Sequence, residues 1–171
     1  MWEELNRRKA TVFFHPSTPG CCRNLIPGLQ ISGIIEYDLD TARAAESLLV
    51  NRTPIRFPDI KFIFSHSGGA LSTLAARIID DLPRTNGLTA EQVETAFKRF
   101  YYETAHASKA AALDALKDIA PISQILFGSD VPIRAYGLTT GGLDEYRGFS
   151  PNDWRAINRG NAERLWPRLK A

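Results

Sequence analysis

Three short apolar runs, each leading to a polar residue, constrain the fold of this chain more than any other feature of its sequence. The run at 10–14 leads directly to His15, the run at 62–64 leads through a serine to His66, and the run at 124–127 leads to Asp130. Runs of β-branched and aromatic residues without polar alternation are typical of strands covered on both faces, as in parallel sheets. The sequence therefore predicts an α/β fold in which these three polar residues meet at the carboxyl edge of a parallel sheet.

A helix is predicted after each strand, which is the order of parallel βα units. Apolar residues between Leu71 and Leu82 recur at helical spacing, and Thr89 with Gln92 matches a capping box that starts another helix. The remaining predicted elements are a helix capped by Asp38 or Asp40, a strand over 100–104, an Ala-rich helix over 108–118 and a terminal helix that begins at Ser150-Pro151. About four βα units result.

Together with the closing segment Gly160–Trp166, the three strand motifs resemble the metal-dependent amidohydrolase family. The resemblance is to its amidohydrolase 2 branch, which includes aminocarboxymuconate-semialdehyde decarboxylase, and it extends from about Thr11 to Trp166. It implies that residues 1–171 form a single domain, the C-terminal half of a (β/α)8 TIM barrel of the metal-dependent hydrolase type.

The length of the chain agrees with half a barrel. A complete barrel of this type needs roughly 250 residues or more, and the chain has 171. Members of the family open with a His-x-His pair on the first strand, whereas the only histidines here are His15, His66 and His106, none of them in such a pair. We therefore expect a truncated product, a fragment or one piece of a split barrel that lacks the N-terminal strands.

The resemblance also implies roles for the residues at the strand ends. His15 and Asp130 match metal ligands, His66 matches the catalytic histidine, and Asp130 also shuttles protons. The metal is expected to be zinc, with manganese as the alternative, and binding by this chain alone is expected to be weak because two ligands are missing. The residues by themselves leave other interpretations open: a core histidine at 15, a structural histidine at 66 and a loop cap at 130.

Other candidate site residues are weaker. The glycines after His66 are expected to leave N–H groups free for an anion, and Glu103 is expected to support the site or contact substrate. Arg134 could pair with a substrate carboxylate. His106 is interpreted as a solvated histidine at the start of a helix, and the three tryptophans as packing residues, at positions 2, 154 and 166.

The function implied by the resemblance is that of a metal-dependent decarboxylase, a carbon–carbon lyase, or of a hydrolase. Its substrate would be a small aromatic or enol-type carboxylic acid. The sequence does not separate decarboxylation from hydrolysis. The alternative is a catalytically inactive half-barrel that needs a partner chain to complete the site. Because a half-barrel has unpaired strand edges, a homo-oligomer or a partner half-barrel is expected.

Composition argues against other partners. Because 21 basic residues nearly balance 19 acidic ones, with no basic block, nucleic-acid binding is not expected. No apolar run approaches the roughly 18 residues that span a bilayer, and no signal-peptide core is visible, so a cytoplasmic protein is expected. The only cysteines, Cys21 and Cys22, are adjacent in sequence and are expected to be reduced thiols rather than a disulfide.

Overall fold

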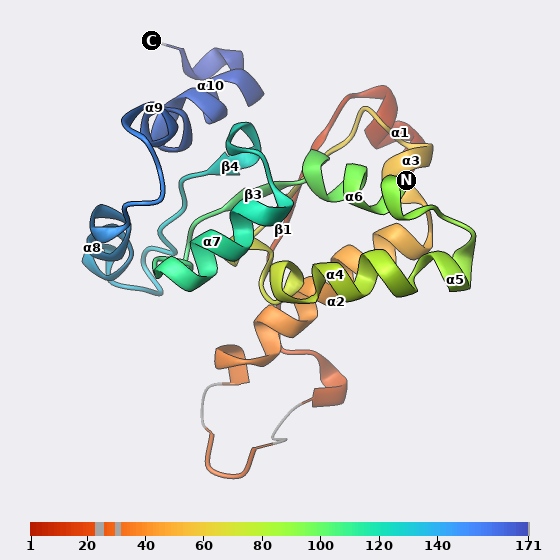
Figure 1. Cartoon of the computed structure of the whole chain (residues 1–171), viewed down its shortest axis with the longest axis horizontal. Helices are drawn as coiled ribbons and strands as arrows, with labels where there is room; N and C mark the ends of the chain where they lie inside the picture. The colour runs from red at the N-terminus through yellow and green to blue at the C-terminus, as the bar shows by residue number, and fades with distance from the viewer. Residues whose placement is uncertain (23–25, 30–31, 171) are drawn as a thin grey trace.

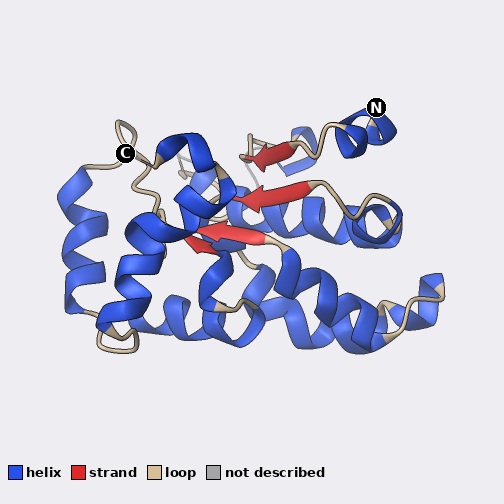
Figure 2. Ribbon diagram, turned by 90° about the horizontal axis from the view of Figure 1, so that it is seen from above, coloured by secondary structure: helices blue, strands red, loops and turns tan. Residues whose placement is uncertain are grey.

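The computed structural model describes residues 1–22, 26–29 and 32–170. Its centre is a four-stranded sheet in which every neighbouring pair is parallel and the strand order follows the sequence. Figure 2 shows the strands side by side and pointing the same way. The strands are β1 (Thr11–Phe14), β2 (Lys61–Phe64), β3 (Tyr101–Glu103) and β4 (Ile125–Leu126). The predicted half-barrel of four βα units is confirmed.

Helices connect the strands and cover one face of the sheet, and further helices precede β1 and follow β4 (Figures 1 and 2). They are α1 (Trp2–Arg7), α2 (Glu36–Val50), α3 (Thr53–Arg56), α4 (Leu71–Asp81), α5 (Pro83–Asn86), α6 (Ala90–Arg99), α7 (Ala110–Ile119), α8 (Tyr136–Glu145), α9 (Pro151–Arg155) and α10 (Asn161–Leu165). Of these, α4 is central, because it packs against α2, α6 and α7.

The core lies between the sheet and these helices, and aromatic rings from neighbouring strands fill it. Phe64 and Tyr102 are fully buried, and the Phe64 ring lies edge-on to that of Phe100 with centroids 5.0 Å apart. Trp2 packs against Phe62 of β2. These contacts explain the apolar residues that each strand directs towards the helices.

Local sequence signals set several helix ends. The predicted capping box at Thr89 and the predicted helix start at Ser150 are both present, and each has the reciprocal pair of hydrogen bonds of a capping box. The predicted start of α2 is wrong: the helix begins at Glu36 with Ile35 as N-cap, so Asp38 lies in its first turn rather than capping it. Acidic side chains in a first turn favour the helix through its dipole without acting as the cap.

The edges of the sheet differ from the expectation. Within the described residues β1 pairs only with β2, and Phe13 is 54% exposed on this strand. The other edge is partly covered, because the Phe127 N–H donates to the carbonyl of Ile157 at 3.0 Å. The side chain of Asn161 donates to the carbonyl of Ile125 at 2.6 Å. The prediction that both edges are open is therefore wrong for β4.

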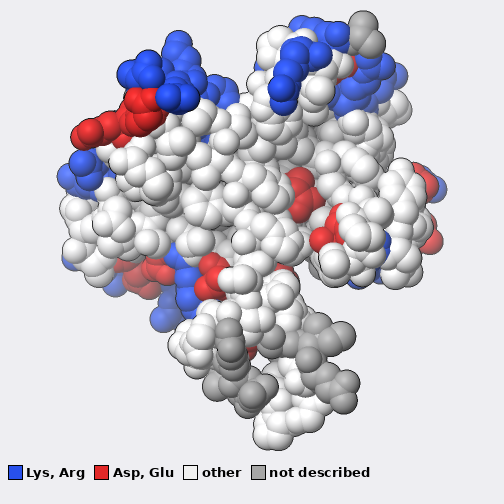
Figure 3. Space-filling view, turned by 180° about the vertical axis from the view of Figure 1, so that it is seen from behind, with Lys and Arg blue, Asp and Glu red and all other residues white. Residues whose placement is uncertain are grey.

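The segment between β1 and α2 extends away from the sheet in its described part (Figure 1). Both cysteines are free thiols, as predicted, with Cys22 buried and Cys21 exposed. Within 1–22, 26–29 and 32–170, no helix combines the length and the apolar character needed to cross a bilayer. On the face shown in Figure 3, basic side chains gather in separate groups near the edges rather than in a continuous stripe.

Candidate metal centre and active site

A cavity of about 320 Å³ opens at the carboxyl ends of the strands. All four strands contribute to it, because parallel strands bring their carboxyl ends to one edge of the sheet. Its lining combines apolar side chains with a few polar groups: Phe13, His15, Ile63, His66, Glu103, Ala105, Leu126, Phe127, Gly128, Ser129, Asp130, Ala162 and Trp166. This mixture is typical of a site for a small organic molecule.

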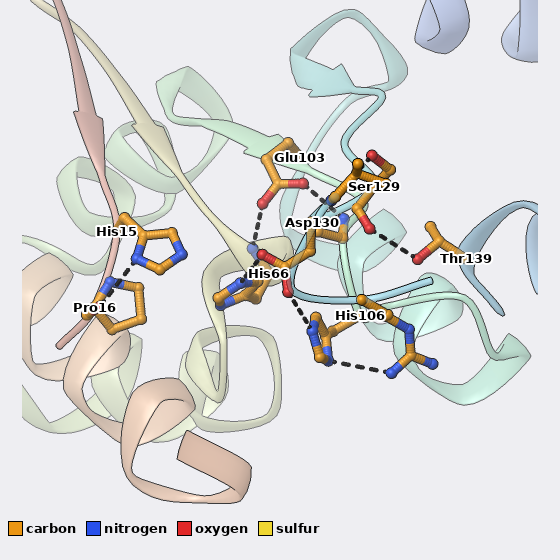
Figure 4. A network of polar contacts seen from close by, with 11 residues as sticks. His15, Pro16, His66, Glu103, His106, Ser129, Asp130 and Thr139 are labelled. Carbon is orange, nitrogen blue, oxygen red and sulfur yellow. Dashed lines mark hydrogen bonds and ion pairs between the residues drawn. The ribbon is translucent and has the colours of Figure 1, made fainter. Parts of the chain in front are cut away.

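His15, His66 and Asp130 come together in this cavity. One potential ligand atom from each lies within 4.8 Å of those of the other two. The residues are about 50 to 64 positions apart in the sequence, and each follows a different strand of the sheet. The prediction that the strands deliver these three side chains to one place therefore agrees with the geometry (Figure 4).

His15 is oriented by the backbone that follows it. Its Nδ1 lies 2.9 Å from the carbonyl oxygen of Pro16, and since a carbonyl can only accept, Nδ1 donates the proton. The neutral ring therefore carries its lone pair on Nε2. Metal-binding histidines are commonly held in this way, with one nitrogen fixed by a backbone carbonyl and the other free to coordinate.

His66 is buried in the centre of the cluster, with its ring centroid 5.1 Å from those of both His15 and His106. Its Nε2 lies 3.8 Å from Asp130 Oδ1, a separation longer than a hydrogen bond. Burial lowers the pKa of His66, the neighbouring imidazole of His106 lowers it further, and Asp130 opposes both effects. The ring is thus kept neutral and able to accept a proton.

His106 is exposed, as expected, but it does not begin a helix, and it contacts Asp130. Its Nε2 lies 2.7 Å from Asp130 Oδ2, and Arg134 Nη1 lies 3.4 Å from its Nδ1. A guanidinium can only donate, so Nδ1 accepts from Arg134 and Nε2 donates to Asp130. His106 was missed because it does not end an apolar run; its position three residues after β3, at the edge where the other site residues lie, was the available signal.

Other expectations about the site also change. Gly68, Gly69 and Ala70 offer no free N–H groups to an anion, because they donate to the carbonyls of Ser65, His66 and Asp38. Trp166 lines the cavity rather than serving only as a packing residue, whereas Trp154 packs against Phe149 as predicted. Arg134 contacts His106 and is absent from the cavity lining.

The donor set at this edge fits a divalent metal ion. Two imidazoles and one carboxylate are ligands shared by zinc and by other divalent transition metals. The free Nε2 of His15 and the second oxygen of Asp130, left available by His106, are the atoms that would coordinate. In protein metal sites, the side chains that bind the metal are regularly held in place by hydrogen bonds to neighbouring groups.

Comparison with known proteins agrees with this geometry. The sequence model of the amidohydrolase family matches residues 1–168. The chain is 36% identical to the 6-methylsalicylic acid decarboxylase of Penicillium expansum over 176 residues, which cover 99% of this chain and 54% of that protein. The chain thus spans about half the length of the curated relatives it matches.

Solved structures share the fold at lower identity. A 2,6-dihydroxybenzoate decarboxylase from Rhizobium is 19% identical with a TM-score of 0.83, over 98% of this chain and 54% of that one. A dihydroxybenzoic acid decarboxylase from Polaromonas sp. JS666, solved with bound manganese and 2-nitroresorcinol, is 20% identical with a TM-score of 0.80, over 99% of this chain and 53% of that one. The parallel half-barrel, its strand-end site and a family match over nearly the whole sequence show that the chain belongs to the amidohydrolase family.

Proposed function

We propose that this chain carries half of the active site of a metal-dependent decarboxylase, a carbon–carbon lyase for small aromatic carboxylic acids. The observation that carries the proposal is the cluster of His15, His66 and Asp130 at the strand ends, within 4.8 Å of one another. The similar proteins named as aromatic acid decarboxylases favour decarboxylation over hydrolysis. The cavity adds support, because side chains such as Phe13, Phe127 and Trp166 offer apolar surface to an aromatic ring.

In this proposal His15 and Asp130 hold a divalent cation, zinc or manganese. When bound, the cation would act as a Lewis acid toward substrate oxygens and lower the pKa of coordinated water. His106 holds one oxygen of Asp130 by a 2.7 Å hydrogen bond, which keeps the other oxygen directed toward His66 and the cavity. The ligand set is thereby fixed before substrate enters.

His66 is proposed as the catalytic acid and base, together with Asp130. Loss of carbon dioxide from an aromatic acid leaves a ring carbon that must gain a proton, so a group at the cavity wall has to deliver one. His66 lines the cavity, and burial keeps its ring neutral at rest, so it can take up a proton from water and deliver that proton to the ring carbon as carbon dioxide leaves. Asp130, 3.8 Å away, compensates the charge that the imidazole then carries.

The remaining ligands and the rest of the substrate wall are proposed to come from outside this chain. The partner would be a half-barrel with a His-x-His strand, and without it the chain is proposed to be inactive. A second copy of the chain could also cover the open side, although its only histidines are the three already in the site. We also propose that residues 1–171 act as a single domain in the cytoplasm.

The proposal predicts activity by complementation. The chain alone, supplied with Zn²⁺ or Mn²⁺, is expected to release carbon dioxide from hydroxybenzoates at the background rate. Addition of an N-terminal half-barrel that carries His-x-His is expected to produce turnover, and Asp130→Asn should abolish it because a ligand is lost. Robust turnover by the chain alone would contradict the proposal that the site is shared with a second half-barrel. Hydrolysis of lactones without decarboxylation would contradict the proposed decarboxylase reaction.

A further inference from the structure

Glu103 is a buried carboxylate beside the proposed catalytic histidine. It ends β3, is 8% exposed and lines the cavity. Its Oε1 accepts the backbone N–H of His66 at 2.7 Å, and its Oε2 accepts the backbone N–H of Ala105 at 2.6 Å. Figure 4 shows the carboxylate lying between the strand ends, with its contact to His66 marked.

The backbone that receives this contact is unusual. His66 has φ 53° and Ser67 has φ 55°, so two successive residues with side chains adopt the left-handed conformation. Residues other than glycine rarely adopt this conformation, because Cβ approaches the backbone too closely. Such strained positions persist only where surrounding contacts hold them. The Glu103 carboxylate supplies one such contact, and the Ser67 hydroxyl donates a second to the Glu103 carbonyl at 3.2 Å.

Gly128 on the neighbouring strand end keeps a place open for this carboxylate. A Cβ at Gly128 would lie 1.7 Å from Glu103 Oε2 and 2.6 Å from its carboxyl carbon, so no side chain fits while Glu103 keeps its position. The φ of Gly128 is not among the positive values of the chain. The glycine is therefore required for space rather than for its backbone conformation.

We propose that Glu103 is a positioning residue that sets the backbone of His66 and thereby directs the His66 ring into the site. Both carboxylate oxygens are engaged by N–H groups, so Glu103 acts through His66 rather than on substrate. The ring of His66 follows its backbone, and its closeness to His15 and His106, 5.1 Å between centroids in each case, depends on that conformation. The importance of Glu103 for catalysis rests on the proposed function, whereas its effect on the position of the His66 ring does not.

The test is nuclear magnetic resonance of the full chain without metal, which reads the position of the ring directly. Cross-peaks from the His66 ring to those of His15 and His106 are expected in the wild type and lost in Glu103→Ala. Glu103→Gln, which keeps only one acceptor oxygen, should retain part of them. Glu36→Gln, at another buried glutamate that is not in the cavity lining, is the matched control and should change none of these signals.

A double-mutant cycle separates positioning from general damage to the fold. Gly128→Ala displaces the carboxylate, so alone it should cause the same loss of cross-peaks as Glu103→Ala. In the Glu103→Ala background the added methyl group meets no carboxylate, so the double variant should match Glu103→Ala. If Glu103→Ala folds poorly, Glu103→Gln and Gly128→Ala still test the contact between the Glu103 carboxylate and the backbone N–H of His66.

The outcomes distinguish the two proposals. Unchanged ring cross-peaks in Glu103→Ala, or additive losses in the cycle, would overturn the positioning role even if the complemented enzyme decarboxylates its substrate. Loss of the cross-peaks in the predicted pattern, with no decarboxylation in any combination of chains, would support the role of Glu103 and overturn the proposed function instead.

Discussion

Asp130 shows how one carboxylate can be prepared for a metal ion by its neighbours. Its backbone has φ 64°, a left-handed conformation that residues with a side chain rarely adopt. Its Oδ2 accepts from His106 at 2.7 Å, and Arg134 fixes the tautomer of that histidine by donating to the opposite ring nitrogen. The side chain of Asp130 is 12% exposed, so a second partner for the remaining oxygen must come from within the cavity. A cation is one such partner.

The support that His106 gives to Asp130 predicts an effect on metal binding. His106→Phe removes the hydrogen bond while keeping a ring of similar size, and the affinity for Mn²⁺ is expected to fall by about 10-fold or more. His106→Gln keeps a donor and should lose less. Electron paramagnetic resonance of free Mn²⁺ measures both, with Lys109→Ala as an exposed neighbouring control. Equal affinity in all variants would show that Asp130 needs no orienting partner.

The sequence predicts a site residue most clearly where a polar side chain follows an apolar run. His15, His66 and Asp130 could be placed from sequence because parallel strands deliver their ends to one edge. His106 could not, because its contact depends on a tight turn with φ 60° that the Ala- and Ser-containing segment does not reveal. Glu103 is a candidate from its place at a strand end, but its contact to the backbone N–H of His66 depends on the left-handed conformation of that histidine.

The elements at the C-terminal end show how local and tertiary signals differ. The capping box at Ser150 could be read directly, since both partners lie within four residues. The role of Asn161 could not, because its side chain is 1% exposed and donates across the fold to the carbonyls of Ile122 and Ile125. These contacts cover the edge of β4, which sequence periodicity alone leaves open.

The capping box at the start of α9 predicts a measurable contribution to stability. In Ser150→Ala the N–H of Asp153 loses its side-chain acceptor, 3.2 Å away in the wild type. The free energy of unfolding should fall by about 1 kcal/mol. Urea denaturation measures the change, and Ser123→Ala, at an exposed serine in a 3-10 turn, is the control. A loss no larger than that of the control would mean that the terminal helix unfolds separately from the core.

The contact between α7 and the end of α8 predicts a pH dependence of stability. Burial raises the pKa of Tyr146 to about 12, with further contributions from its hydrogen bond to Asp114 and from the charge of that residue. Because the folded state holds this proton more tightly, the stabilisation is present below the usual tyrosine pKa of about 10 and is lost as the pH rises towards 12.

Tyr146→Phe should remove this part of the alkaline destabilisation. The difference in unfolding free energy between neutral and alkaline solution is expected to be smaller in Tyr146→Phe than in the wild type. Tyr136→Phe, at a tyrosine that is 57% exposed, should keep the wild-type profile. Identical profiles in all three proteins would mean that the Asp114 contact does not survive in solution.

At the scale of the whole molecule, the sheet is covered by helices on one face, and the other is the wall of the cavity. Phe13, Ile63 and Leu126 belong to that wall. In a closed barrel the corresponding side chains face other strands, which fill the interior in layers. Here the matched relatives are about twice as long as the chain, so the described residues account for one side of such an interior.

This open side predicts association in solution. Phe13 is 54% exposed on β1, whose outer edge pairs with no strand in the described part of the chain. Unpaired edges and exposed apolar surface favour pairing with another chain, and since β4 is partly covered, β1 is the expected point of contact. We therefore expect a homodimer or larger species by light scattering, unless a partner half-barrel is present.

Phe13→Glu should shift the population towards monomer, because a charge on the open face opposes its burial. Leu74→Glu, at an exposed leucine on α4, should leave association unchanged. A monodisperse wild-type monomer at high micromolar concentration, with cooperative thermal unfolding, would mean that the half-barrel is stable with this face in water.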